Sequence, residues 1–522
     1  MAEARVIVVG AGIGGLVSAL LLARRGLQVT LIEAAETPGG KMRQQRVGGV
    51  AIDAGPTVFT MRWVFEQILD EAGFGLDDLP HMTPLSTLAR HVWRGQDARL
   101  DLHADRARSV DAIAEFAGPA EARRFEAFCR QAREVYTRLE GPYIRGARPD
   151  LLSMTRGLGA GGLAALIGLG PFASLWRSLG RHFRDPRLHQ LFGRYATYCG
   201  ASPWLAPATL MLVAQVELDG VWSVDGGMHG LAQRVADLAE RRGVTLRYGA
   251  PVEQILLDQG RASGVRLRGG ETLLADAVVF NGDPQALVQG LLGGSLRAAV
   301  PAVPRAHRSL SAVTWAVAAP TSGFPLERHN VFFDDDYASE FTDVFQRRQL
   351  PTRGTVYVCA QDRGVDTPVQ AGASERLLCL VNAPPDGDLR PFAPVETDPC
   401  EYRSLGLLRQ CGLRIEARRD QVRCTTPHDF HQRFPATGGA LYGQATHGWM
   451  SSFRRPGSSC RIPGLFLAGG GVHPGPGVPM AALSGRQAAA ALMAHLASNS
   501  RSRQVAISGG MSTRSATTAG TP

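Results

Sequence analysis

The sequence predicts an α/β protein, and three observations near its N-terminus support that prediction. A short apolar strand at residues 6–9 leads into a glycine-rich turn at 10–15, which opens an amphipathic helix at 16–25. A second strand at 28–32 follows, and it ends on Glu33. In this order, the elements form the dinucleotide-binding unit of a Rossmann-like fold. A glycine fingerprint alone is a weak signal, but here the flanking strand, helix and acidic residue supply the context that the motif requires.

The residues of this unit have separate physical roles. Gly10 permits the tight turn, Gly12 lets a pyrophosphate approach the backbone, and Gly15 lets the helix pack close to the strand. The helix N-terminus offers free N–H groups to the phosphates. Glu33 falls where a carboxylate accepts hydrogen bonds from the ribose hydroxyls. Its negative charge argues against a 2′-phosphate on the ligand.

A second glycine element follows Glu33. Residues 37–43 are Thr-Pro-Gly-Gly-Lys-Met-Arg, and residues 53–57 are Asp-Ala-Gly-Pro-Thr. A nicotinamide site needs neither segment. A longer dinucleotide lying across the domain needs both, because glycines admit its phosphates and cations balance their charge. Lys41 is the only lysine in the chain; a leftover lysine on a solvated loop is the alternative to a phosphate contact.

Together these segments resemble the start of the amine-oxidase/phytoene-desaturase superfamily and are most similar to bacterial carotenoid desaturases. The resemblance extends in order over residues 1–497 and implies FAD as the cofactor. It also includes a C-terminal strand and glycine turn at 465–479. The implied cofactor-binding residues are Gly10, Gly12, Gly14, Gly15, Glu33, Gly39, Gly40, Lys41, Arg43, Gly55, Pro56, Thr57, Val252, Gly469, Gly470, Gly477, Val478 and Pro479.

The middle of the chain is expected to complete the cofactor domain. A predicted helix at 231–242 is followed, between residues 244 and 281, by short β-rich runs that should form a small sheet packed on the dinucleotide fold. In the resembled family this block closes the adenine side, where the backbone of Val252 meets the adenine. The C-terminal turn leads into an Ala-rich helix ending near residue 497, whose N-terminus would offer N–H groups to a flavin carbonyl.

The sequence therefore predicts a discontinuous Rossmann-like FAD-binding domain and an α+β substrate domain formed by insertions. The C-terminal tail is rich in Ser, Thr and Gly, lacks acidic residues, and is predicted to be disordered. The predicted boundaries are 1–75, 222–285 and 455–497 for the FAD-binding domain, 76–221 and 286–454 for the substrate and membrane-associating domain, and 498–522 for the tail.

Composition excludes several classes of protein. A hydrophobic content of 44% is ample for a core, and a mean hydropathy of −0.06 excludes a polytopic membrane protein. The N-terminal apolar strand is too short for a secretory signal, and the eight cysteines form no Cys-x-x-Cys pair. We therefore expect a cytoplasmic protein with reduced thiols. His428 and His431 could share a helix face but lack a third ligand, so we expect no metal. The net charge of +9 comes from dispersed arginines, so nucleic-acid binding is not expected.

One apolar run points to the membrane. Residues 157–176 carry no charge, and arginines flank the run on both sides. Its glycines and Pro171 weaken a membrane span. An element lying in the membrane interface, or at the mouth of an apolar tunnel, fits better, with a buried helical hairpin as the alternative. The expected location is therefore the inner face of the cell membrane, with peripheral attachment.

A second stretch, residues 192–204, predicts where the substrate binds. Arg194, Tyr195 and Tyr198 could line an apolar channel and meet a polar end of the substrate, although core packing is the alternative. This stretch is more similar to the hydroxycarotenoid 3,4-desaturase branch (methoxyneurosporene dehydrogenase type) than to the phytoene desaturase branch. The latter more often has Asn-Pro-Phe where this chain has Ser-Pro-Trp at 202–204.

The resemblance implies an apolar carotenoid substrate and a desaturation in which flavin accepts a hydride from a C–C bond beside the polyene. Little general-base strength is needed, so no catalytic residue is assigned. Glu217, Asp219 and Asp225 are candidate proton acceptors by position only. The alternatives are a phytoene desaturase, a related isomerase or oxygenase, and a non-catalytic lipid carrier resembling GDP-dissociation inhibitors. An amine oxidase would need a compact polar substrate pocket, and the apolar run at 157–176 does not indicate one.

Overall fold

The computed structural model describes residues 4–150, 172–364, 369–370 and 372–508. Its first layer is a five-stranded parallel sheet in the order β21-β13-β1-β2-β9. Three distant parts of the sequence supply these strands, so the sheet is assembled from a discontinuous chain. The strands are β1 (Arg5–Val9), β2 (Gln28–Ile32), β9 (Thr245–Arg247), β13 (Ala277–Phe280) and β21 (Leu465–Leu467).

The expectation of one small sheet between residues 244 and 281 is wrong in part. Strands β9 and β13 join the parallel sheet instead. All four residues of β13 are buried, as expected of a parallel strand covered on both faces. The separate three-stranded sheet contains only β10 (Val252–Asp258), β11 (Arg261–Leu267) and β12 (Thr272–Leu274).

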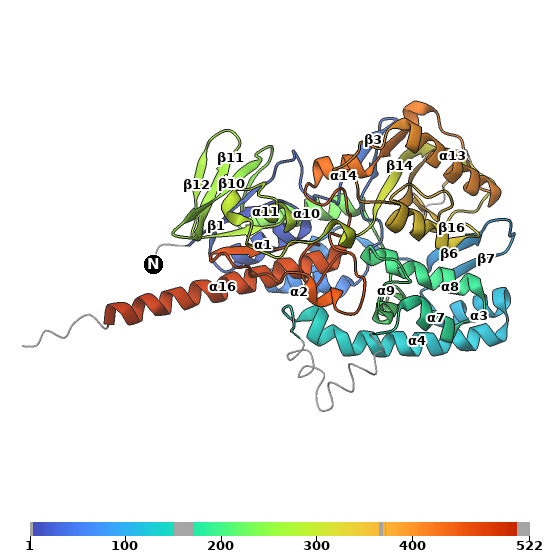
Figure 1. Ribbon diagram of the computed structural model, residues 1–522, viewed down its shortest axis with the longest axis horizontal. Coiled ribbons are helices and arrows are strands. Elements are labelled where there is room, and N and C mark those ends of the chain that lie inside the picture. Colours follow the sequence, from blue (N-terminus) through green and yellow to red (C-terminus); the bar gives the residue numbers. More distant parts are fainter. Residues whose placement is uncertain (1–3, 151–171, 365–368, 371, 509–522) are drawn as a thin grey trace, which may run out of the picture.

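Helices pack on the parallel sheet and bury its apolar side chains. Helix α1 (Ile13–Arg24) has ten buried residues and shares one core with α2 (Arg62–Ala72), α10 (Gly227–Arg241) and α16 (Val478–Ser508). Helix α16 runs past the expected end near residue 497 (Figure 1). The structure continues the helix through residues 498–508, a segment without Pro or Gly, where the sequence predicts the start of a disordered tail. Residues 509–522 lie outside the described residues.

The two insertions build a second, mixed sheet of seven strands in the order β20-β14-β18-β17-β16-β6-β7. Only the β16–β6 pair is parallel. The strands are β6 (Thr87–Trp93), β7 (Arg99–His103), β14 (Ser311–Ala319), β16 (His329–Phe333), β17 (Val356–Ala360), β18 (Glu375–Ala383) and β20 (Val422–Thr425).

A group of helices from the first insertion lies on one side of this sheet, and helices from the second insertion lie on the other (Figure 1). No helix among the described residues is long and apolar enough to cross a membrane. The first group is α3 (Arg106–Ala117), α4 (Pro119–Leu139), α7 (Leu175–His182), α8 (Pro186–Gly193) and α9 (Leu212–Leu218), and the second includes α13 (Pro394–Gln410) and α14 (Pro427–Arg433).

Candidate functional site

The first glycine turn has the geometry that its sequence predicts. Gly10 has φ of 102°, a conformation that favours glycine. Gly12 is the N-cap of α1 and has no side chain to cover the helix N-terminus. A Cβ on Gly15 would overlap the carbonyl oxygen of Gly10, so the helix packs against the turn as closely as expected. The free N–H groups at the start of α1 therefore remain open to an anionic ligand.

Glu33 lies beside this turn, directly after β2. One carboxylate oxygen accepts a hydrogen bond from Ala11 N at 2.6 Å, and the other accepts from Ala35 N at 2.8 Å. The backbone of Glu33 also accepts from Ala250 N at 2.9 Å, so the segment that leads to Val252 lies next to it. The structure thus brings the acidic strand end and the start of β10 together, in the arrangement expected at the adenosine end of a dinucleotide.

The second glycine element packs directly on the first. Gly39 N donates to Ala11 O at 2.8 Å, and Gly39 forms a parallel bridge with Gly12. A Cβ on Gly55 would overlap the carbonyl oxygen of Lys41, so the turn containing Pro56 and Thr57 folds back on the Gly-Gly-Lys segment. These contacts join the three segments into one glycine-lined surface.

The C-terminal glycine turn closes the same surface. A Cβ on Gly14 would lie 2.9 Å from both Ala481 O and Gly469 N, so α1 and the start of α16 touch through their backbones. Gly469 has φ of 109° and Gly477 has φ of 115°. Helix α16 begins at Val478, with Pro479 in its first turn, where a proline without an N–H is well tolerated. Gly14 therefore lets the two helices pack closely, and its place in the cofactor site stays a prediction.

Two cations from the second glycine element lie in different surroundings. Lys41 Nζ donates to Leu441 O at 2.5 Å. Its side chain is exposed, yet burial among protein groups lowers its pKa. A side chain that faces a recess in the protein can be reached by solvent and still be surrounded by protein groups, which accounts for both its exposure and its lowered pKa. The Arg43 guanidinium instead lies over the Phe430 ring of α14 at 5.5 Å, and its Nε and Nη2 are buried without a partner among the described residues.

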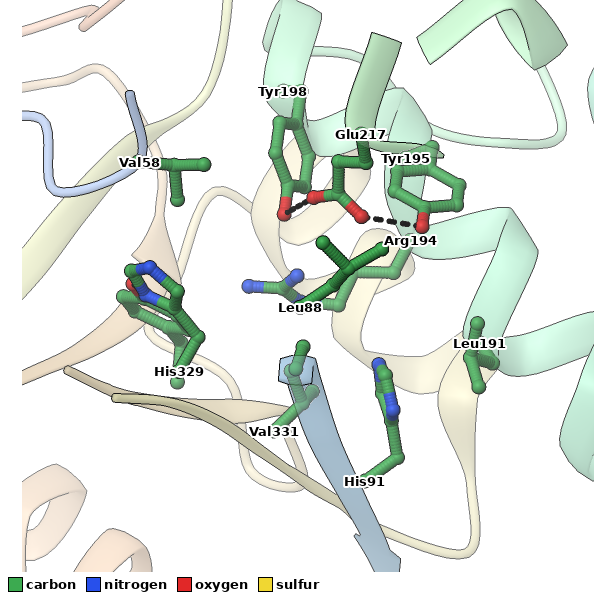
Figure 2. Close-up of a pocket in the computed structure, with 12 residues that line it drawn as sticks. Val58, Leu88, His91, Leu191, Arg194, Tyr195, Tyr198, Glu217, His329 and Val331 are labelled. Carbon is green, nitrogen blue, oxygen red and sulfur yellow. Dashed lines mark hydrogen bonds between the residues drawn. The ribbon is translucent and has the colours of Figure 1, made fainter. Parts of the chain in front are cut away.

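A polar pocket lies between the seven-stranded sheet and the helices of the first insertion (Figure 2). Apolar side chains such as Val58, Leu191 and Val331 line part of it. The remaining lining includes Arg194, Tyr195, Tyr198, Glu217, His329 and Tyr357.

Three of these groups form a buried clasp. Tyr195 and Tyr198 lie three residues apart on a 3-10 helix (Arg194–Cys199), which places them on one face. Their hydroxyls donate to the two oxygens of Glu217 on α9, at 2.5 and 2.6 Å (Figure 2). Burial raises the pKa of both tyrosines and of the Glu217 carboxyl. The expected substrate residues are thus together, but both hydroxyl protons are committed to Glu217.

The opposite wall of the pocket carries a second hydrogen-bonded chain. The Tyr357 hydroxyl lies 2.7 Å from Thr57 Oγ1 and 2.7 Å from His329 Nδ1. His329 is 3% exposed, and its Nε2 is buried without a partner among the described residues. Burial lowers the pKa of His329 to about 3. Thr57 belongs to the second glycine element, so this chain connects the expected cofactor surface to the pocket.

The three candidate proton acceptors occupy different positions. Glu217 lines the pocket. Asp219 accepts from Gln215 Nε2 at 2.6 Å, and Asp225 is exposed in the turn before α10. Of these three candidates, only Glu217 therefore belongs to the pocket.

Among the described residues, no group of three or more His, Cys, Asp and Glu side chains is placed to hold a metal ion.

Comparison with known proteins agrees with this geometry. A model of the flavin containing amine oxidoreductase family matches residues 13–493. A hydroxyneurosporene desaturase from Rubrivivax gelatinosus is 67% identical over 99% of this chain and 98% of its own length. Another from Cereibacter sphaeroides is 47% identical over 95% of this chain and 99% of its own length. The chain belongs to the carotenoid desaturases, within the flavin-containing amine oxidoreductase family.

A solved oxidoreductase structure from Methanosarcina mazei has the same fold as this desaturase. It superposes with a TM-score of 0.58 over 92% of this chain and 99% of its own, at 15% identity. The desaturase is an FAD-dependent oxidoreductase that acts on CH–CH groups. The sequence resemblance, the cofactor and the α/β fold are thereby confirmed.

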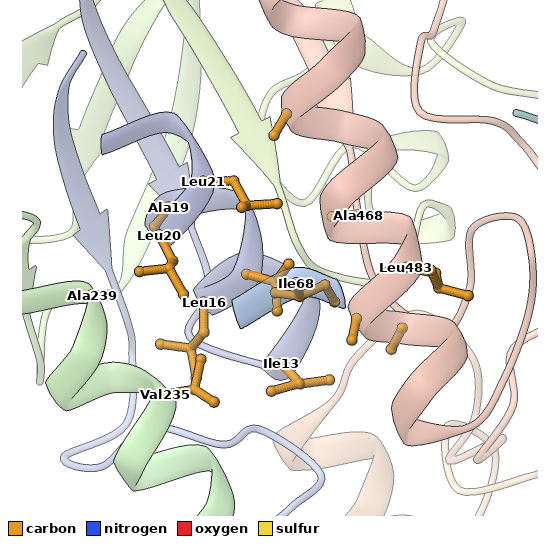
Figure 3. Close-up of a cluster of buried hydrophobic side chains, with 14 of the residues drawn as sticks. Ile13, Leu16, Ala19, Leu20, Leu21, Ile68, Val235, Ala239, Ala468 and Leu483 are labelled. Atoms are coloured by element: carbon orange, nitrogen blue, oxygen red, sulfur yellow. The ribbon is translucent and has the colours of Figure 1, made fainter. Parts of the chain in front are cut away.

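The residues present fit FAD. Gly12, Gly39 and Gly469 contribute backbone rather than side chains to this surface, and Lys41 supplies a cation on the adjoining segment. Helix α1 is held between α10 and α16 by buried apolar side chains such as Leu16 (Figure 3), so this desaturase presents a rigid turn to its cofactor.

Sequence reasoning missed two polar residues of the desaturase's cofactor surface. Asn281 follows β13, donates from Nδ2 to Gly10 O at 3.2 Å, and lies against Gly12, Gly14 and Gly469. Asp53 accepts from Met228 N at 2.6 Å, at the start of α10. The sequence signal for Asn281 was an asparagine directly after a buried strand. The signal for Asp53 was its place as the first residue of the Asp-Ala-Gly-Pro-Thr turn.

Proposed function

We propose that this carotenoid desaturase introduces a double bond between C3 and C4 of acyclic carotenoids that carry a hydroxyl or methoxy group at C1. The observation that carries the proposal is the polar pocket beside Thr57, which offers hydrogen-bonding groups to one end of an otherwise apolar substrate. The 67% identity to a hydroxyneurosporene desaturase over nearly the whole chain supports the same substrate class.

The chain's own residues bind and orient in this proposal. FAD, when bound, supplies the hydride acceptor. The glycine elements, Glu33, Lys41, the Val252 segment and the C-terminal turn would hold it, as the sequence resemblance implies. The buried pocket excludes water from the reacting end of the polyene, which keeps the local dielectric low. The Tyr195–Glu217–Tyr198 clasp fixes one wall of that pocket.

The main alternative is a phytoene-type substrate, which lacks oxygen altogether. A hydrocarbon end group would leave His329 Nε2, a buried atom of the pocket lining, without a partner, and an unpaired buried polar group costs about 1–3 kcal/mol. The pocket therefore favours an oxygenated end. The carrier alternative is set aside because the chain is an FAD-dependent oxidoreductase.

Competition between two substrates tests the proposal. The purified enzyme, reconstituted with FAD, receives equal amounts of 1-hydroxyneurosporene and phytoene in lipid vesicles. We expect the hydroxylated carotenoid to be desaturated faster, with the new double bond at C3–C4. Faster conversion of phytoene would assign the chain to the phytoene-type alternative instead.

The proposal includes peripheral attachment to the inner face of the cell membrane, because the substrate is insoluble in water. Residues 157–171 of the expected membrane segment lie outside the described residues. The described part of the chain resumes with exposed apolar side chains. Phe172 is 65% exposed and Leu205 is 52% exposed. Phe172 also contacts Trp449 edge-to-face at 5.3 Å. Arg177 and Arg181 on α7 are exposed nearby and would face anionic headgroups.

Liposome binding tests this surface. Replacing Phe172 and Leu205 together by Asp should release the protein from anionic liposomes and slow turnover without loss of FAD. Val395 on α13 is 80% exposed, so Val395→Asp is a matched control that should leave liposome binding unchanged. Intact liposome binding by the double variant would place the membrane contact elsewhere.

A further inference from the structure

The chemistry of the proposed substrate restricts where its oxygen can lie. The oxygen is on C1 and the reacting bond joins C3 to C4, so ordinary bond lengths keep the oxygen within about 4 Å of C3. A group that recognises the oxygen must therefore lie beside the reacting bond, next to the cofactor. It must also be buried and short of a hydrogen-bond partner, because only such a group gains from pairing with the substrate.

The tyrosines of the clasp do not meet this requirement. Tyr195 and Tyr198 each have one hydroxyl proton, and each donates it to Glu217, at 2.5 and 2.6 Å. Both oxygens of Glu217 accept one of these bonds. The clasp is thus internally paired, and it shapes the pocket wall without offering an open donor.

His329 meets each part of the requirement. It is 3% exposed and lines the pocket, and its Nε2 has no partner among the described residues (Figure 2). Its Nδ1 is fixed by the Tyr357 hydroxyl at 2.7 Å, and that hydroxyl is also 2.7 Å from Thr57 Oγ1. Because Thr57 belongs to the expected cofactor surface, the ring is tied to the side of the pocket where the reacting bond must lie.

Arg194 lies in the same pocket and supplies a charged donor. Its guanidinium lies over the rings of Tyr198 and Tyr357, at 5.6 and 5.3 Å from their centroids. Burial acts against its charge, but Tyr198 and Tyr357 outweigh that effect, and the pKa of Arg194 is raised. Its side chain also shares a hydrogen bond with Tyr198, but a guanidinium has five N–H groups, so others can face a ligand oxygen.

We propose that His329 Nε2 is the hydrogen-bond partner of the substrate's C1 oxygen, with Arg194 beside it, and that His329 is the residue that sets the preference for oxygenated end groups. This inference rests on the proposed function, since it names the recognition group of the same pocket. The neutral imidazole serves in either tautomer, because Nε2 can accept from a hydroxyl or donate to it. The ligand class is a tertiary alcohol at the end of an acyclic polyene.

The test compares 1-hydroxyneurosporene with neurosporene, which has a C1=C2 double bond in place of the C1 hydroxyl. His329→Phe keeps a flat ring but removes both nitrogens. We expect kcat/KM for the hydroxylated substrate to fall by about tenfold to a hundredfold, with that for neurosporene nearly unchanged. His329→Gln restores a polar group and should recover part of the preference. Tyr195→Phe, which alters the clasp alone, should leave the ratio of the two substrates unchanged.

Equilibrium binding separates this inference from the proposed function. Affinities for both carotenoids are measured by quenching of tryptophan fluorescence, after FAD content and thermal unfolding show that each variant is folded. If the wild type converts neither carotenoid, the proposed function fails, and the binding ratio still decides the role of His329. An unchanged ratio in both His329 variants would overturn the inference, as would loss of the preference in Tyr195→Phe.

Discussion

Glu33 offers the sharpest test of the cofactor surface. Its carboxylate accepts two backbone N–H groups, from Ala11 at 2.6 Å and from Ala35 at 2.8 Å, and this fixes its position beside the glycine turn. Each carboxylate oxygen retains a further lone pair for a ribose hydroxyl. Glu33→Ala removes the charged acceptor while leaving the strand and the turn in place.

The expected loss follows from the strength of charge-assisted hydrogen bonds, about 1.5–3 kcal/mol. At about 1.4 kcal/mol for each tenfold, FAD should bind roughly 10- to 150-fold more weakly. The apoprotein is titrated with FAD, and binding is followed by flavin fluorescence. Thermal unfolding of the apoprotein shows whether the variant is folded.

Glu36 provides a matched control for this experiment. It is exposed on the same segment, three residues after Glu33. Glu36→Ala removes an equal charge and should leave FAD affinity unchanged. A folded Glu33→Ala variant with wild-type affinity would refute the assignment of Glu33 to the ribose. An equal loss in both variants would mean that net charge, rather than a specific contact, governs binding.

Three further predictions concern packing and charge. Gly14→Ala should force α1 and α16 apart, because the new Cβ would lie 2.9 Å from Ala481 O. We expect the free energy of unfolding, measured in urea, to fall by about 1–3 kcal/mol, and an unchanged value would contradict the packing argument. Asp388→Ala leaves buried Arg308 without its two 2.8 Å bonds, and should cost about 3–5 kcal/mol by the same measurement. Burial lowers the pKa of His91 to about 4, so between pH 6.5 and pH 4 the unfolded chain binds the proton first and the free energy of unfolding falls as the pH falls. His91→Gln should reduce the slope of unfolding free energy against pH by up to about 1.4 kcal/mol per pH unit. An identical slope in the variant would refute this.

The parts of the fold that the sequence predicted well are local. Strands β1 and β2 lie within one residue of their expected positions, because short buried strands are marked by apolar runs and by the glycine turn between them. Helix α1 begins at Ile13 rather than at residue 16. Glycine has low helix propensity, so the sequence assigns Gly14 and Gly15 to the turn. In the structure Gly14 packs closely on α16 and Gly15 packs on Gly10, and both are helical.

The parts that the sequence did not predict depend on distant contacts. Asn281 reaches the glycine turn from 271 residues away, and His329 meets Thr57 only through Tyr357. No periodicity or spacing marks such a residue. Tyr195 was expected to meet the substrate, whereas its hydroxyl proton is donated to Glu217. That difference comes from the packing of α9 on the 3-10 helix, which composition and spacing do not encode.

One anaerobic experiment tests the central claim, that this protein is an FAD-dependent desaturase of hydroxylated acyclic carotenoids. The FAD-loaded enzyme is mixed with 1-hydroxyneurosporene in vesicles without oxygen, and flavin absorbance and the carotenoid are followed together. We predict bleaching of the flavin in step with a product that has lost two hydrogens and carries the new double bond at C3–C4. Flavin that stays oxidised while the hydroxylated carotenoid is recovered unchanged would contradict the account.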